Sequence, residues 1–193
     1  MMKYVLILIV ALVAPAVAQA QSFEERQAVQ VVEEMASDVF QAVRGGSEAQ
    51  RASRLVSVIQ RHVELDQVSQ SALGAIWDEL TPSQRSDFTR IYVEMIASQY
   101  ALAFDGRGGE RFRTLDTFEL AGGQIRVRGE VNIAGEAIPV GFIVGAGYRD
   151  GIRNIILNDV ALVDRDRQVF EATWEASGQD YAAFASALRE SLQ

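Results

Sequence analysis

The chain has 193 residues, 49% of them hydrophobic, and a formal net charge of −8 at pH 7. A protein this acidic is repelled by phosphate backbones, so its charge argues against nucleic acid as a partner. The sequence contains no cysteine, which excludes both disulfides and a lipid anchor on a cysteine. Stability must therefore come from the burial of apolar side chains.

The first twenty residues have the pattern of an export signal. Lys3 supplies a positive charge, the apolar run 4–13 follows, and Ala-Gln-Ala at 18–20 matches the small-x-small pattern of a signal-peptidase site. The apolar run is well short of the roughly 20 residues that span a bilayer as a helix. We therefore expect residues 1–20 to be removed as a signal peptide. Residues 21–193 should then remain as a single domain in the periplasm, with a net charge of −9 once Lys3 is lost.

Residues 22–104 are predicted to be helical. Three capping boxes, in which two side chains three residues apart cover each other's free backbone N–H groups, mark helix starts. They are Ser22 with Glu25, Ser47 with Gln50, and Thr81 with Gln84, the last with Pro82 at the first helical position. Asp66 is expected to cap a further helix. The helix from Pro82 to about Phe104 has an apolar stripe wider than a two-helix contact requires. We therefore expect this helix to contact other helices and also a sheet.

From Arg107 the apolar period changes from 3.6 to 2, which predicts an antiparallel sheet. The four expected strands are 114–120, 125–133, 138–144 and 153–163, with turns at 134–136 and 145–151. Gly129 indicates a bulge or bend in the second strand. Asn158 and Asp159 are predicted to form a bulge in the last strand, because the apolar positions shift frame there.

The last part of the chain is again predicted to be helical. Residues 165–176 lead to Gly178, a residue typical of a helix stop, and Asp180 is expected to cap a short final helix. Helices, then an antiparallel meander, then helices is the order typical of an α+β fold. We therefore expect a curved four-stranded sheet with the helices packed on one face.

The sequence offers few groups for catalysis. His62 is the only histidine, and in the absence of cysteine it cannot form an ordinary zinc site. No serine lies in a G-x-S-x-G elbow, and the glycines at 106–109 lack the Lys-Ser or Lys-Thr of a phosphate loop. We therefore predict no catalytic residue, no metal and no cofactor. An enzyme of the cone-shaped α+β type would need a polar dyad inside its cavity, for which His62 is the sole imidazole.

The sequence has more apolar surface than its elements obviously need. One face of the sheet, the wide stripe of the long helix and Trp77 must all be covered. Either a filled core or a core with a cavity for a hydrophobic guest would cover them, and periodicity alone does not separate these alternatives.

Several short segments of the sequence, taken together in their order and spacing, match the pattern of a known protein family. The matching residues are Leu65-Asp66, Leu73-Gly74, Trp77, Leu80-Thr81-Pro82, Arg85, Phe88 and Tyr100, followed by Ile155-Ile156-Leu157, Val160-Ala161-Leu162-Val163, Arg167, Phe170 and Gly178-Gln179-Asp180. This set resembles the MlaC-type proteins, the periplasmic phospholipid shuttles of the outer-membrane lipid asymmetry pathway, also called the toluene-tolerance family. The chain departs from that family at Asn154, where an aspartate is common, at the pair Asn158-Asp159, where Glu-Gly is usual, and at Ala161, where serine is usual.

The resemblance implies a deep apolar cavity between the sheet and the helices, which holds the acyl chains of a phospholipid while its head group stays in water. It also implies two partners, an inner-membrane ABC transporter complex with an MCE-type lipid-binding ring and an outer-membrane lipoprotein complex. The residues expected to line the cavity are Trp77, Phe88, Ile91, Tyr92, Met95, Tyr100, Phe104, Ile125, Val127, Val140, Phe142, Ile155 and Leu157.

Three alternatives to a phospholipid carrier remain open, and the first is the enzyme of the cone-shaped α+β type whose sole imidazole would be His62. A related branch of the family is associated with hopanoids, so the guest could be a hopanoid or another lipid. A periplasmic interaction protein without a ligand would instead have a solid core.

Overall fold

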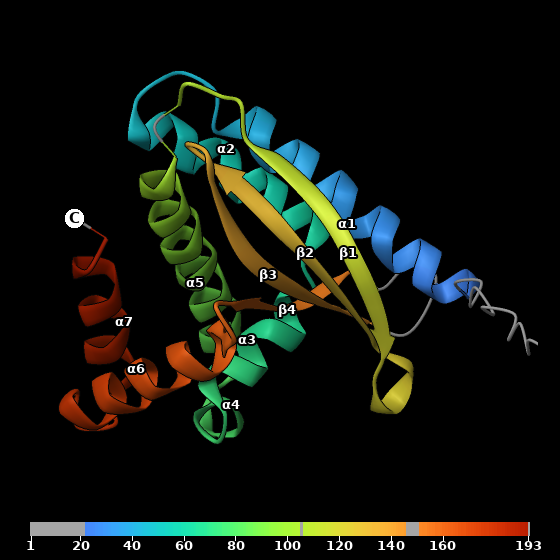
Figure 1. Ribbon diagram of the computed structural model, residues 1–193. Helices are drawn as coiled ribbons and strands as arrows, with labels where there is room; N and C mark the ends of the chain where they lie inside the picture. Colours follow the sequence, from blue (N-terminus) through green and yellow to red (C-terminus); the bar gives the residue numbers. More distant parts are fainter. Residues whose placement is uncertain (1–21, 105, 146–150, 193) are drawn as a thin grey trace, which may run out of the picture.

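The structure is a computed structural model that describes residues 22–104, 106–145 and 151–192 (Figure 1). The signal peptide predicted at 1–20 lies outside the described residues, as does most of the turn predicted at 145–151. Helices come first, an antiparallel sheet follows, and helices close the chain. The predicted α+β class is therefore confirmed.

Within residues 22–104, five helices precede the sheet. They are α1 (Phe23–Ala42), α2 (Glu48–His62), α3 (Leu65–Leu73), α4 (Ile76–Glu79) and α5 (Pro82–Ala103). The three predicted capping boxes are all present, at the starts of α1, α2 and α5. The start of α3 differs from the prediction, because Glu64 occupies the cap position and Asp66 lies in the first turn. A carboxylate in a first turn still interacts favourably with the helix dipole, which explains why Asp66 is suited to this place.

In the described part of the chain, the sheet has five strands in sequence order. They are β1 (Arg111–Glu119), β2 (Ile125–Ile133), β3 (Glu136–Val144), β4 (Ile152–Leu157) and β5 (Val160–Ala161). The predicted count of four is wrong because Asn158 and Asp159 form a hairpin and not a bulge. Both have positive φ, 49° and 62°, as in a type I′ turn, and Leu157 pairs with Val160 across it. Helix α6 (Leu162–Ala176) then begins three residues earlier than expected, and α7 (Tyr181–Glu190) ends the fold.

The irregularity predicted at Gly129 lies on the facing strand. The register between β1 and β2 shifts between Thr114 and Asp116, opposite Gly129. Glycine is needed in β2 because a Cβ at this position would approach the Phe112 ring to 2.4 Å. The Phe112 ring thereby also reaches Phe142, with ring centroids 5.7 Å apart in an edge-to-face arrangement.

The buried apolar residues of the described part of the chain form three clusters. In the first cluster, Ala28 and Val32 of α1 pack on one end of the sheet, over Ile125, Val127 and Val144. The second joins α2 to α5, and the third is an aromatic cluster between α3, α5, α6 and α7. Figure 1 shows α1 running along the sheet, with α5, α6 and α7 at the other side of the molecule.

Candidate functional site

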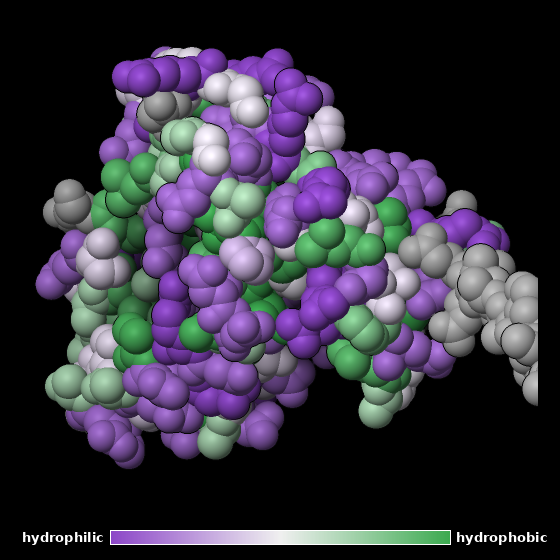
Figure 2. Space-filling view, in the orientation of Figure 1, coloured by the Kyte–Doolittle hydropathy of each residue, from purple (hydrophilic) through white to green (hydrophobic). Residues whose placement is uncertain are grey.

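A cavity lies between α5 and the apolar face of the sheet, with α1 and α2 forming further walls. The cavity volume is about 230 Å³, many times the roughly 10–15 Å³ that a single water needs. It is therefore far larger than an ordinary packing defect. Figure 2 shows hydrophobic residues in the gaps between hydrophilic ones on the face where Figure 1 shows α5 and the sheet.

Two regular elements form the main walls. On α5, Tyr92, Ile96 and Tyr100 recur every four residues and so lie on one side of the helix. Opposite them, Val140 and Phe142 alternate along β3, which places both on the same face of the sheet. The remaining wall residues are mostly apolar and include Met35, Ala36, Val39 and Phe40 of α1, Leu55 and Ile59 of α2, and Ile155 and Leu157 of β4.

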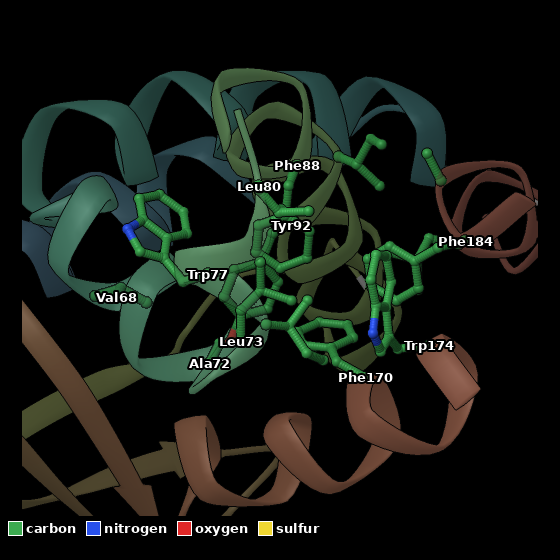
Figure 3. Close-up of a cluster of buried hydrophobic side chains, with 14 of the residues drawn as sticks. Val68, Ala72, Leu73, Trp77, Leu80, Phe88, Tyr92, Phe170, Trp174 and Phe184 are labelled. Carbon is green, nitrogen blue, oxygen red and sulfur yellow. The ribbon is translucent and has the colours of Figure 1, made fainter. Parts of the chain in front are cut away.

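The structure divides the thirteen predicted lining residues into two groups. The seven that line the cavity are Tyr92, Tyr100, Phe104, Val140, Phe142, Ile155 and Leu157. The other six lie outside the lining. Trp77 and Phe88 belong to the aromatic cluster (Figure 3), as does Ile91, and Met95 packs against it. Ile125 and Val127 lie under α1. Contact of any of the thirteen with lipid stays a prediction.

Sequence reasoning missed the contribution of the first two helices. Met35 and Val39 belong to the helical stripe of α1, and Leu55 and Ile59 to that of α2, and all four line the cavity. The period of the stripe predicts that these residues are buried. It contains no information about whether the partner across the stripe is protein or an open space.

Polar groups gather at the seam between α5 and α6. The Arg165 guanidinium donates from Nε and Nη2 to Asp166 Oδ1, at 3.0 and 2.7 Å. The Tyr92 hydroxyl donates to Asp166 Oδ2 at 2.7 Å. Gln99 Oε1 accepts from Arg165 Nη2 at 3.3 Å. All four residues also line the cavity, so its mostly apolar wall is polar on this side.

Burial and charge act together on the tyrosines of this side. Burial raises the pKa of Tyr92 well above its ordinary value, and the negative charge of Asp166 raises it further. Burial also raises the pKa of Tyr100 to about 12. Both phenols are therefore neutral hydrogen-bond donors at any physiological pH.

The single histidine lies away from the cavity lining. His62 Nε2 lies 2.8 Å from Asp38 Oδ2, and Arg61 Nη1 contacts the same oxygen at 2.6 Å. The hydrogen bond from His62 lowers the pKa of Asp38, as does the charge of Arg61. These contacts join the end of α2 to α1. The enzyme alternative requires a polar dyad inside the cavity, and neither His62 nor Asp38 is part of the cavity lining.

Two further features of the described residues concern metals and membranes. Within 22–104, 106–145 and 151–192, no group of three or more His, Cys, Asp or Glu side chains is placed to hold a metal ion. Across these same residues, every helix lacks either the length or the apolar character needed to cross a bilayer.

The fold and the cavity together define the class: an α+β protein whose helices hold an apolar cavity against one face of an antiparallel sheet. The chain belongs to the MlaC family, because the model of that family, described as MlaC protein, matches residues 26–190. A search of curated proteins finds no match.

A solved structure supports the fold. The phospholipid-binding protein from Ralstonia solanacearum, solved in complex with a phospholipid, superposes with a TM-score of 0.73. The two sequences are 17% identical, and the match covers 86% of this chain and 96% of the other. At this identity the comparison establishes a shared fold.

Proposed function

We propose that this protein binds a phospholipid in the cavity and carries it through the periplasm, without catalysing a reaction. The observation that supports the proposal is the apolar cavity between α5 and the sheet, in a member of the MlaC family. The fold is shared with a protein that was solved in complex with a phospholipid. An interaction protein with a solid core, the main alternative, does not account for a cavity of about 230 Å³.

The physical need for such a carrier follows from the hydrophobic effect. Each methylene group hidden from water contributes roughly 0.8 kcal/mol, and a two-chain lipid has on the order of thirty of them. Such a lipid cannot leave a bilayer for water at a useful rate. A cavity walled by residues such as Ile155, Leu157 and Phe142 replaces the bilayer around the chains.

Lipid that co-purifies with the protein tests the binding proposal. We expect the mature protein, denatured and extracted with organic solvent, to release phospholipid in an amount comparable to that of the protein, measured by mass spectrometry. Recovery of hopanoid in place of phospholipid would support the alternative cargo. A preparation that releases no lipid of either kind, from cells rich in both, would contradict the carrier proposal.

The proposed route runs between an inner-membrane ABC transporter complex with an MCE-type lipid-binding ring and an outer-membrane lipoprotein complex, as part of outer-membrane lipid asymmetry. Exchange with bare membranes should be slow, because acyl chains that pass from the cavity to a bilayer are exposed to water on the way. We expect labelled phospholipid to stay on the protein in the presence of plain vesicles and to move at least tenfold faster to vesicles that contain either complex. Equal rates for both kinds of vesicle would exclude these complexes as partners.

A further inference from the structure

One buried polar atom in the wall of the cavity has no hydrogen-bond partner among the residues that the structure describes. The hydroxyl oxygen of Tyr100 is buried and makes no hydrogen bond to any described residue. Four other buried side-chain atoms share this condition, on Glu64, Thr89, Glu110 and Arg126, but none of these residues lines the cavity. The unmet donor of Tyr100 is therefore the one that a guest in the cavity could satisfy.

The half-buried side chain of Tyr100 packs on one side against protein and lines the cavity on the other. Tyr100 packs against the cluster that joins α2 to α5, together with Ile96 and Phe104. Its neighbour Tyr92, two turns earlier on α5, is already engaged with Asp166 at 2.7 Å. The two tyrosines thus differ: the hydroxyl of Tyr92 serves the structure, while that of Tyr100 is free to donate.

The surroundings of Tyr100 mark a boundary between apolar and charged space. Tyr100, Arg165 and Asp166 line the same cavity, and Arg165 Nη2 donates at 3.3 Å to Gln99 Oε1, on the residue that precedes Tyr100 in α5. The Arg165 side chain is 40% exposed, whereas that of Asp166 is 15% exposed. A lipid whose chains occupy the cavity would therefore pass from hydrocarbon to head group at this side.

We propose that the Tyr100 hydroxyl donates a hydrogen bond to an acyl-ester carbonyl of the bound lipid, at the point where the chains meet the glycerol and the head group emerges beside Arg165. The inference rests on the proposed function and specifies its substrate class as ester-linked lipids. A carbonyl oxygen accepts the proton of a neutral phenol well. A guest that presents only hydrocarbon there leaves the hydroxyl unpaired, at a cost that selects against it.

The test compares two lipids that differ only at the ester. Delipidated protein is incubated with vesicles of equimolar diacyl and dialkyl phosphatidylcholine of equal chain length, then reisolated, and its lipids are measured by mass spectrometry. We expect the wild type to be enriched in the diacyl form by roughly threefold to tenfold, the effect of one net hydrogen bond. In Tyr100→Phe the ratio should fall to about one with total lipid unchanged.

Tyr181→Phe is the matched control. It removes a hydroxyl that donates to Gln84 and Asp87 outside the cavity, so it should keep the wild-type lipid ratio even where it lowers stability. A wild type without ester preference, or a Tyr100→Phe variant that keeps the preference, would overturn the assignment of Tyr100 while leaving lipid binding intact. Uptake of neither lipid by the wild type would contradict the proposed function, and the inference with it.

Discussion

Phe142→Glu is expected to lower co-purified lipid by at least tenfold. Phe142 is 5% exposed and lies in the cavity wall on β3. A carboxylate at this position would face acyl chains, and burial of a polar group without a partner costs about 1–3 kcal/mol or more. Each 1.4 kcal/mol corresponds to a tenfold change in affinity. The measurement is the molar ratio of lipid to protein, by mass spectrometry of the purified variant at neutral pH.

The neighbouring residue provides a matched control. Ile143 follows Phe142 on the same strand, so its side chain points to the opposite face of the sheet, and it does not line the cavity. Ile143→Glu should therefore keep the wild-type lipid content. Val140→Phe adds apolar volume to the same wall without a charge and should also lower lipid content, with the fold preserved by circular dichroism. Wild-type lipid levels in both Phe142→Glu and Val140→Phe would place the lipid outside this cavity.

The three helix starts with a capping box were predictable because the interactions that fix them are local. Ser22 with Glu25 and Thr81 with Gln84 satisfy backbone N–H groups within three residues, so the sequence pattern alone specifies the contact. The hairpin at Asn158 was harder to recognise. An apolar frame shift is produced equally by a bulge and by a two-residue turn, and only the positive φ of both turn residues distinguishes them.

Only about half of the residues predicted to line the cavity do so, because a buried position in the sequence pattern has more than one possible neighbour. The stripe of α5 is wide enough to reach three surroundings: Phe88 faces the aromatic cluster, Val93 faces α2, and Tyr100 faces the cavity. All three have the pattern of buried residues. Which of them contacts packed protein depends on how the helices cross, and crossing angles are set by side chains far apart in the sequence.

Substitutions in the packed core and in the cavity wall should also differ in how much they lower the free energy of unfolding. Phe170 is 1% exposed (Figure 3). The centroid of its ring lies 5.2 Å from the ring centroids of both Phe88 and Tyr92, in an edge-to-face arrangement in each case. Phe170→Ala should lower the free energy of unfolding by about 3–5 kcal/mol, because it removes these contacts and leaves a void that packed neighbours fill only in part. The lipid content of the folded fraction should stay at the wild-type level, since Phe170 is outside the lining.

Phe40→Ala is the matched substitution in the cavity wall, and the comparison with Phe170→Ala distinguishes the two environments. Phe40 is half-buried and contacts Phe104 edge to face at 6.4 Å, but its cavity side has no protein atoms to lose. In delipidated protein, urea unfolding with an unchanged m value should show a loss at least about 1–2 kcal/mol smaller than for Phe170→Ala. Bound lipid stabilises the folded state by mass action, and a variant with an altered cavity wall should bind it less well. Addition of lipid should therefore increase the difference in free energy of unfolding between the wild type and Phe40→Ala. Equal losses for the two variants, with and without lipid, would mean that the wall at Phe40 is packed as tightly as the aromatic cluster and encloses no space for an acyl chain.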